Sequence, residues 1–566
     1  MSLVTYYLSP QICMWKKVLS GSAYLLQKKQ TTILSAAGVI MATVFVSRIL
    51  GLVRDRLLAT YFDVDVLGVY FAAFRLPNLV FELLIMGALA TAFIPVFTTL
   101  LVRDEEKNAF AMASNVINAS LLLALILVLP LILFTRQLSY LLVPGFSEPQ
   151  RAQMITYTRI MLVGQLVPLI IGNFVTGMLQ SFQRFLVPAL APVFYNLGII
   201  LGIVFLTPVI GLSGAVWGVV IGAVFYLLIQ LPLLFHLGFR WQWVLDLKHQ
   251  GLREVGRLML PRTFGMAVSQ IDITVDLILA SFLGSRAITI FYFAQHLQQL
   301  PIGLFGGTFA QAALPSLSTK AAEKNHTDFK NTVLASMHQI LFFVLPASVL
   351  LSVLRTPVVR LVFGAARFDW AATVATGYTL SFFALSIFAQ SLVQLFGRAF
   401  YALHDTKTPV VIGVISVVIN TVLSLVFILV LKYEVWALAL STSIASIVNG
   451  LLLMISLHLK VEGFDLKKLL IPPLKIAVAS LFTGLFIYIP LKLFDQLVFD
   501  TTRVIDLILL TGLASVSGLS VYIFLAWFLD IEEVTAFFKI LQKVKKVPRM
   551  FFPQTTELVN GDRPTV

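Results

Sequence analysis

The stretch LLLALILVLPLILF, from Leu121 to Phe134, contains fourteen consecutive residues without a charged or amide side chain. A helix needs about 20 mainly apolar residues to cross the hydrocarbon core of a bilayer. About 14 segments of that kind follow one another along the chain, so the sequence predicts an all-α polytopic membrane protein. Their approximate centres are Thr43, Leu84, Leu123, Pro168, Gly198, Gly222, Ser269, Gly303, Phe343, Ile387, Val418, Ile447, Phe482 and Ser515.

The composition excludes several other classes of protein. Of the 566 residues, 59% are hydrophobic and only 12% are charged, whereas soluble domains carry roughly 45–50% apolar and about 25% charged residues. A water-soluble enzyme of several domains is therefore excluded. Glycine and proline occur at ordinary levels, which excludes a collagen-like or disordered chain. The longest predicted loops have about 20 residues, too few for an aqueous domain, so we expect the chain to act within the membrane.

The excess of basic residues indicates the orientation of the chain rather than a nucleic-acid partner. There are 41 Lys and Arg against 27 Asp and Glu, a net charge of +14. If the N-terminus lies inside the cell, about 25 of the basic residues fall on the inner side and about 11 on the outer side. We therefore expect a multi-pass membrane protein with both termini in the cytoplasm. The single cysteine, Cys13, allows no intramolecular disulfide.

The sequence repeats itself after about 221 residues. LQSFQRFLVPAL, which contains Pro188, resembles ALHDTKTPVVI, which contains Pro409, and Asp55 and Asp276 have the same separation. Six predicted helices per copy give both copies the same orientation, so we expect two lobes related by a pseudo-two-fold axis along the membrane normal, with a substrate between them. The predicted parts are a cytoplasmic extension (1–30), an N-lobe of helices one to six (31–247), a C-lobe of helices seven to twelve (248–460), helices thirteen and fourteen (461–530) and a cytoplasmic, amphipathic basic tail (531–566).

Three predicted helices carry charged residues that lipid would reject. A charge at the centre of a membrane helix costs about 2.5–3.5 kcal/mol, so it normally faces a cavity or a partner. Together with Ser47, Gly51, Asn78 and Ser269, they recur mostly at spacings of three, four or seven residues, which keeps most of each set on one helix face. The charged residues are Arg48, Arg54 and Asp55 on helix one, Arg75 and Glu82 on helix two, and Arg262, Asp272 and Asp276 on helix seven.

Two interpretations of these charged stripes remain open. They are structural ion pairs or side chains that reach the interface from helix ends, or they line a binding site at the lobe interface. The arginines favour an anionic substrate, because guanidinium groups bind phosphate in a planar, two-pronged geometry. A pyrophosphate headgroup is the ligand that this pattern suggests.

Several motifs resemble the MurJ (MviN) family. They are SRILGLVRD (Ser47–Asp55), FRLPN (Phe74–Asn78), FIPVF (Phe93–Phe97), LASFLGS (Leu279–Ser285), LPIGLFG with ALPSLS (Leu300–Ser318) and FGRAFYALHDTKTPV (Phe396–Val410). The family belongs to the multidrug/oligosaccharidyl-lipid/polysaccharide exporter superfamily. The resemblance implies a flippase that moves lipid II, the undecaprenyl-pyrophosphate-linked peptidoglycan precursor. It also implies fourteen helices, the last two forming a groove for the lipid tail.

By the same resemblance, Arg48, Arg54 and Asp55 match cavity residues of the family, and Arg75 matches a basic position on helix two. The chain departs from the family pattern at Gly68, Phe81 and Met86, where some members have charged residues. His296 stands where some members have an arginine on helix eight. We expect that substrate contact to be weaker or dependent on pH, because free histidine titrates near 6.5. Glu82, Arg262 and Asp272 are the residues that would compensate.

The family also implies a coupling ion. Some members bind sodium between helices seven, eleven and twelve, and Asp276, Asn420 and Thr442 would supply the oxygen ligands that a hard cation requires. A role for Asn420 in a hydrogen bond between helices is the alternative. Proton coupling and the membrane potential remain open as driving forces. We expect no organic cofactor, because the chain lacks a nucleotide-binding G-x-x-x-x-G-K-[ST] motif.

The expected function is a lipid II flippase that works by alternating access, with lipid II and the bilayer as partners and a monomer as the working unit. The alternative within transport is an exporter of another lipid-linked oligosaccharide or polysaccharide, or a drug exporter of the same superfamily. A membrane-embedded transferase would need a longer aqueous loop. A scaffold without transport would tolerate replacement of the intramembrane arginines.

Overall fold

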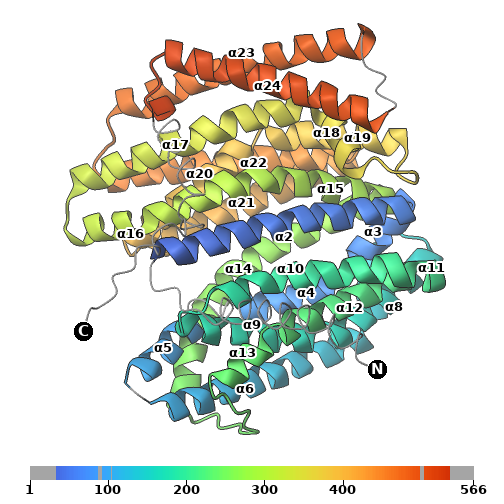
Figure 1. Ribbon diagram of the computed structural model, residues 1–566, viewed down its shortest axis with the longest axis vertical. Coiled ribbons are helices and arrows are strands. Elements are labelled where there is room, and N and C mark those ends of the chain that lie inside the picture. Colours follow the sequence, from blue (N-terminus) through green and yellow to red (C-terminus); the bar gives the residue numbers. More distant parts are fainter. Residues whose placement is uncertain (1–32, 87–91, 104, 498–502, 536–566) are drawn as a thin grey trace, which may run out of the picture. The chain divides into compact units, whose positions relative to one another are not determined.

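The computed structural model describes residues 33–86, 92–103, 105–497 and 503–535, and every regular element of these residues is a helix (Figure 1). The elements of the first repeat are α2 (Ile33–Tyr61), α3 (Val64–Ala73), α4 (Arg75–Phe81), η1 (Glu82–Met86), α5 (Ile94–Val102), α6 (Glu106–Leu133), α7 (Thr135–Leu142), α8 (Glu148–Gly164), α9 (Leu166–Ser181), α10 (Leu186–Leu201), η3 (Gly202–Leu206), α11 (Thr207–Ile210), α12 (Leu212–Leu228) and α13 (Leu231–His236). The remaining elements are α14 (Gln250–Phe282), α15 (Ser285–Pro301), η4 (Ile302–Gly307), α16 (Thr308–Ala322), α17 (His326–Val353), α18 (Arg355–Phe363), α19 (Trp370–Ala384), α20 (Ile387–Ala402), α21 (Lys407–Leu425), η5 (Val426–Val430), α22 (Trp436–Lys460), α23 (Leu466–Leu497) and α24 (Val504–Phe528).

Ten helical segments of the described chain are long and apolar enough to cross a membrane, and the bent pair α19 and α20 raises this number to 11. These segments account for eleven of the fourteen predicted helices. The other three, centred at Thr43, Ser269 and Gly303, fall on α2, α14 and η4. Two of these, α2 and α14, bear most of the charged residues singled out above, which lowers their hydropathy. The all-helical membrane fold is confirmed, whereas the total of fourteen spans stays a prediction.

The order and lengths of the helices follow the sequence repeat. Helix α6 begins at Glu106 and α17 begins at His326, 220 residues later, and both have 28 residues. Helices α9 and α20 each have 16 residues and begin 221 residues apart. The π-helical segments η1 and η4 also occupy equivalent positions. Equal lengths in equivalent places indicate that each repeat folds by the same plan.

The second predicted helix is broken three residues before its proline. Helix α3 ends at Ala73, the chain turns at Phe74, and α4 contains Pro77 in its first turn. Proline has no backbone N–H, so the carbonyl group four residues earlier loses its helical partner. The helix therefore breaks at Phe74, and this break directs Arg75 into the interior.

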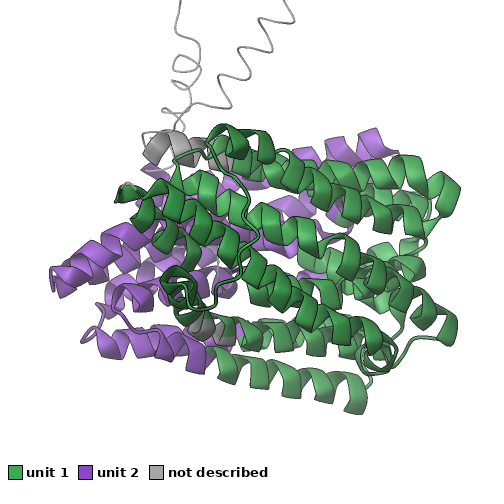
Figure 2. Cartoon of the chain, turned by 90° about the horizontal axis from the view of Figure 1, so that it is seen from below, with its two compact units in different colours: residues 1–296, 359–379, 413–445 green, residues 297–358, 380–412, 446–566 purple. Residues whose placement is uncertain are grey.

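The chain forms two compact units (Figure 2). Unit 1 comprises residues 1–296, 359–379 and 413–445, and unit 2 comprises the remainder. Unit 1 contains an apolar core around Phe93, Phe97 and Phe174, and unit 2 has its own around Phe329 and Phe396. These units follow packing rather than the repeat, so the lobe boundary at residue 247 stays a prediction. The proposed N-terminal extension and most of the basic tail lie outside the described residues.

Helices α10 and α12 of unit 1 pack at unusually close range. A Cβ atom on Gly202 would lie 2.2 Å from Cα of Gly218, and one on Gly198 would lie 2.4 Å from Cα of Gly222. Small residues at four-residue spacing let two membrane helices bring their backbones together. This contact fixes α10, which carries Asn196 to the site described next.

Candidate functional site

The central feature of unit 1 is a buried carboxylate shared by two basic side chains. Asp55, on α2, is 1% exposed, and its Oδ1 accepts a 2.9 Å hydrogen bond from Nε of Arg54. Its Oδ2 lies 2.7 Å from Nδ1 of His296, on α15. A buried carboxylate is costly unless paired and hydrogen-bonded, and here each oxygen has a partner. The sequence places these residues 241 positions apart, whereas the fold brings them into contact.

Polar and aromatic side chains from the same two helices and from two further ones, α3 and α10, surround this trio. Asn196, on α10, accepts a 3.3 Å hydrogen bond from Nη1 of Arg54 and donates to Ser47 on α2. The ring of Tyr292 lies 4.1 Å from the ring of His296 and stacks at 3.9 Å on Phe71. These contacts hold Arg54 and His296 in one orientation. The side chains of Arg54 and His296 remain 16% and 29% exposed, so each retains a path to a ligand.

Arg75 forms a separate link between predicted helices two and seven. Its Nη2 donates a 2.7 Å hydrogen bond to the carbonyl oxygen of Gln270, and its Nε donates at 2.9 Å to Thr274. Both acceptors belong to α14, and Arg75 is buried. Glu82 is half-buried at the start of η1. Arg75 therefore bonds to neutral groups, and the structure does not place it on Asp55.

The two carboxylates of α14 meet at a third place. Asn420, on α21, donates from Nδ2 to Oδ1 of Asp272 at 2.8 Å and to Oδ1 of Asp276 at 3.4 Å. Ser424 donates to Oδ1 of Asn420 at 3.4 Å and lies 2.6 Å from the hydroxyl group of Ser441. Asp276 is 4% exposed. Among the side chains that the structure describes, no cation forms an ion pair with either carboxylate.

The predicted residues thus divide among separate clusters rather than forming one continuous stripe. Thr442 donates to the carbonyl oxygen of Leu438 in its own helix and does not join the carboxylates. Arg48 is half-buried on α2, and Arg262 lies on α14 with a side chain outside the described part of the chain. The sequence analysis missed Asn196, Gln270, Ser424 and Ser441. Asn196 had a usable signal, because it is an amide within an apolar segment.

A polar clasp joins the starts of four helices of unit 1, α3, α8, α15 and α19. Arg286 forms ion pairs with Asp65, at 3.9 Å, and with Asp369. Ser285 donates to Asp65 at 3.3 Å and accepts a 2.9 Å hydrogen bond from Gln150. The hydrogen bond from Arg286 holds the pKa of Asp369 below its usual range. The clasp connects segments of both repeats, which is where a transporter that alternates access would have to separate.

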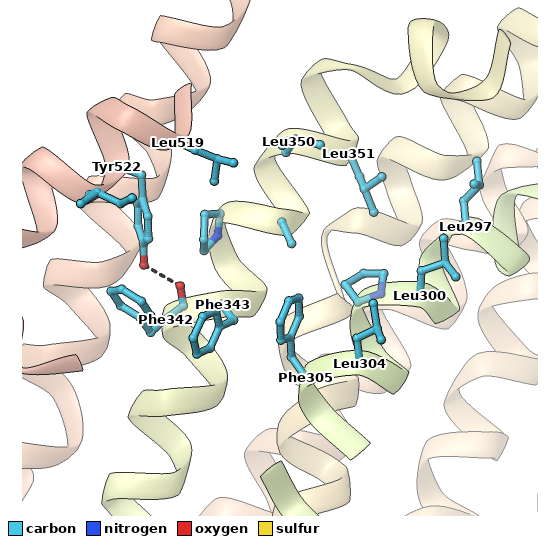
Figure 3. A pocket seen from close by; sticks show the side chains of 14 residues that line it. Leu297, Leu300, Leu304, Phe305, Phe342, Phe343, Leu350, Leu351, Leu519 and Tyr522 are labelled. Atoms are coloured by element: carbon cyan, nitrogen blue, oxygen red, sulfur yellow. Dashed lines mark hydrogen bonds between the residues drawn. The ribbon is translucent and has the colours of Figure 1, made fainter. Parts of the chain in front are cut away.

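Unit 2 contains an apolar pocket of about 310 Å³ (Figure 3). Its walls come from α15 with η4, from α17 and from α24. The hydroxyl group of Tyr522, on α24, donates a 2.6 Å hydrogen bond to the carbonyl oxygen of Phe342, on α17, and is thereby satisfied. The rest of the lining is aliphatic or aromatic, so the pocket suits a length of hydrocarbon. The lining includes Leu297, Leu300, Leu304, Phe305, Phe343, Leu350, Leu351 and Leu519.

These features define the class of the protein, which is a polytopic transporter. The fold is an all-helical membrane fold with a doubled helix plan, charges are buried in clusters within it, and it contains an apolar pocket. The chain belongs to the family described as lipid II flippase MurJ, whose sequence profile matches residues 58–505. The resemblance found in the motifs is therefore confirmed.

Three relatives carry the family name. Proteins named "Probable lipid II flippase MurJ" from Vibrio cholerae and Bdellovibrio bacteriovorus are each 29% identical to the chain. The first match covers 76% of this chain and 83% of the relative, and the second covers 91% and 98%. A protein of Burkholderia cenocepacia named "Lipid II flippase MurJ" is 26% identical over 73% of this chain and 81% of its own.

Solved structures support the same fold. A lipid II flippase MurJ in an inward closed conformation matches with a TM-score of 0.69 and 26% identity, over 85% of this chain and 98% of the other. An inward-facing multidrug resistance transporter of the MATE family matches with a TM-score of 0.61 and 16% identity, over 75% of this chain and 98% of its own. The second likeness concerns the fold alone.

Proposed function

We propose that this chain is a lipid II flippase, which moves the undecaprenyl-pyrophosphate-linked peptidoglycan precursor from the inner to the outer leaflet by alternating access. The observation that carries the proposal is the buried carboxylate of Asp55, shared between Arg54 and His296. In this arrangement the carboxylate of Asp55 balances the positive charge of Arg54, so a basic group can lie inside the membrane protein. A drug exporter for organic cations is disfavoured, because it would need an excess of acidic groups in this place.

The substrate's pyrophosphate would compete with Asp55 for its basic partners. Arg54 has a planar guanidinium group that can exchange a carboxylate for a phosphate in the same geometry. His296 would add a second cationic contact whenever it is protonated. Arg48 lies two turns earlier on α2 and would approach the same ligand. Because Asp55 is bonded to residues of both repeats, release of its partners would loosen the contact between α2 and α15.

The pocket between α15, α17 and α24 would take part of the lipid chain. Its lining is apolar, and its one phenolic hydroxyl group is bonded within the protein. A hydrocarbon chain there would bury apolar surface without leaving a polar group unsatisfied. Since α24 belongs to the predicted pair of helices at 461–530, this pocket supports their assignment to the lipid tail.

The proposed setting is the bacterial inner membrane, with both termini in the cytoplasm and a monomer as the working unit. The distribution of basic residues between the predicted loops supports the orientation. In a cell that is negative inside, outward movement of an anion is favoured by about 2.3 kcal/mol per charge per 100 mV. The membrane potential is therefore one proposed driving force for the outward movement of the substrate.

Asp272, Asp276 and Asn420 are the proposed site of a coupling cation, either sodium or a proton. Two carboxylates around one amide provide the oxygen ligands that a hard cation prefers. We expect Asp276→Asn to abolish the dependence of lipid II export on a sodium or proton gradient, measured in vesicles with an imposed gradient. Asp246→Asn, which removes a carboxylate from an exposed loop, is the control. An unchanged ion dependence in Asp276→Asn would exclude this site.

The test of the proposed function is complementation. A bacterial strain depleted of its own lipid II flippase would receive the unmodified protein, and the lipid II exposed on the outer leaflet would be measured with an impermeant reagent. We expect growth and surface lipid II to return together. Growth without restored lipid II, or expression without either, would contradict the proposal.

A further inference from the structure

The connection between the two repeats contains an extended segment that the proposed function does not use. Residues 240–247 run without regular secondary structure between α13 and α14, and we refer to them as the strap. Val244 is 43% exposed, and three further exposed apolar side chains alternate along the strap: Trp243 is 89% exposed, Leu245 is 48% exposed and Leu247 is 64% exposed. An extended chain places alternate side chains on the same side, so these three form one apolar edge.

The strap is attached to α6 by polar side chains. Asn118 donates 2.8 Å hydrogen bonds to the carbonyl oxygens of Gln242 and Val244. Asn115 both accepts from the backbone N–H of Asp246 and donates to its carbonyl oxygen, at 2.9 and 2.8 Å. The backbone groups of the even-numbered residues therefore form hydrogen bonds with side chains of α6. The odd-numbered apolar side chains take no part in this attachment.

The attachment also fixes the depth of the strap in the membrane. Ser114, which accepts a hydrogen bond from Gln242, and Asn118 lie seven and three residues before the apolar stretch that begins at Leu121. At about 1.5 Å per residue, these are about 10 and 5 Å from its start. The headgroup zone of each leaflet is about 5–7 Å thick outside the hydrocarbon core. The fourteen residues of that stretch span only about 21 Å of a core of about 30 Å, so the boundary of the core falls within the turns of α6 before Leu121. Because the strap is bonded to these turns, it lies at the boundary between the hydrocarbon and the headgroups.

From this position we infer that the strap is a lipid-binding edge, which inserts Trp243, Leu245 and Leu247 into the headgroup zone of the adjacent leaflet. Tryptophan is enriched at this level, because its ring is apolar and its N–H remains close to water. A ladder of aromatic rings, Phe110, Phe239, Trp241 and Trp243, leads from the core of unit 1 to this edge.

The charges beside the strap match an anionic leaflet. Arg240 is the first residue of the strap and Lys248 follows its last. Arg253 and Arg257 lie on the first turns of α14, and the acidic residues nearby are Asp246 and Glu254. Arg253 also donates from Nε to the carbonyl oxygen of Leu247 at 3.3 Å, so a basic group lies at the end of the edge. Basic residues near a leaflet with acidic lipids are attracted to it electrostatically. The strap would thus anchor the connection between repeats to the bilayer while the helices move.

A nitroxide depth measurement tests this inference. In a Cys13→Ser background, single cysteines replace Leu245 on the strap, Lys107 at the start of α6 as the aqueous reference, and Leu125 in the apolar stretch as the hydrocarbon reference. The labelled full chains are placed in vesicles of phosphatidylethanolamine and phosphatidylglycerol. Accessibility to oxygen and to a water-soluble nickel complex then gives the depth of each label.

We expect the ratio of oxygen accessibility to nickel accessibility at position 245 to be several-fold higher than at position 107. It should remain lower than the ratio at position 125. Adding Trp243→Ala, or omitting phosphatidylglycerol, should move it toward the aqueous value. A label at 245 that matches 107 would overturn the inference and leave the edge free for a soluble partner. A label shielded from both reagents would overturn it as well, because a second copy of the chain would then cover the edge. The readout requires no transport, so failure of the proposed function leaves it intact.

Discussion

At the scale of single residues, one carboxylate decides how the site holds its charge. Asp55 is buried and has one basic partner on each oxygen, Arg54 from its own helix and His296 from α15. Removal of one member of a buried ion pair costs about 3–5 kcal/mol, because the other charge is left uncompensated. The sequence predicted all three residues and left open whether they form ion pairs or bind a substrate, but it did not identify which pairs form.

We expect Arg54→Ala to abolish lipid II export. Loss of a buried charged contact weakens anion binding by about 2–5 kcal/mol, which is more than tenfold in affinity. Surface lipid II in a complemented strain is the measurement, with protein levels checked in parallel. Arg56→Ala, two residues further along α2, is the matched control, because Arg56 donates to the carbonyl oxygen of Leu361 and lies outside the trio. Normal export in Arg54→Ala would remove this residue from the site.

The role of His296 can be separated from mere packing. We expect His296→Arg to support export with less dependence on pH, because a guanidinium group stays charged while it keeps a contact with Asp55. His296→Leu should lose export, since the carboxylate would then have Arg54 alone. The measurement is lipid II export in vesicles at several pH values between 5.5 and 8. Identical pH profiles for the wild type and His296→Arg would contradict this role.

Asp405, in the turn between α20 and α21, gives a prediction about stability. Lys460 and the backbone N–H of Thr408 bond to its carboxylate and hold its pKa well below the usual range. A lowered folded-state pKa stabilises the protein above the unfolded value, near 3.9, and this stabilisation is lost as the pH falls. We expect Asp405→Asn to lower the melting temperature at pH 7 and to have a smaller effect near pH 3. Asp465→Asn, at another helix start, is the control.

At the scale of elements, close backbone packing decides where α10 lies. The side chain of Asn196 reaches Arg54 only because α10 is held against α12 by paired glycines. The apolar runs predicted both helices, because a membrane span is a matter of local hydropathy. Their close contact follows from small residues on two facing surfaces, and a single sequence does not reveal which surfaces face each other.

Gly202→Ala tests this packing. Its new methyl group would meet Cα of Gly218 at 2.2 Å, so the helices must separate, at a cost of about 1–3 kcal/mol. Thermal unfolding in detergent is the measurement. Gly413→Ala is the matched control, because a Cβ atom there meets nothing within 4 Å and alanine favours a helix by about 1 kcal/mol. Equal melting temperatures for the two variants would contradict the packing argument.

At the scale of the whole molecule, alternating access requires the polar clasp to open. Asp65 belongs to the first repeat and Ser285 to the second, and their side chains lie 3.3 Å apart. We expect cysteines at both positions, in a Cys13→Ser background, to stop lipid II export once a short bis-maleimide joins them. The double variant without reagent and each single variant with it should still transport. Export that survives complete cross-linking would show that these segments never separate.

The sequence by itself determined the membrane class, the doubled helix plan, the family and nearly every charged residue of the site. These properties are local or periodic, so hydropathy, spacing and motifs reveal them without coordinates. The tertiary structure alone decided the partners. It joined His296 to Asp55, Asn420 to Asp272 and Asp276, and Arg75 to the backbone of α14, and it left Thr442 within its own helix. Hydrogen bonds between distant segments depend on how helices rotate and approach one another, and that is fixed by the packing of the whole chain.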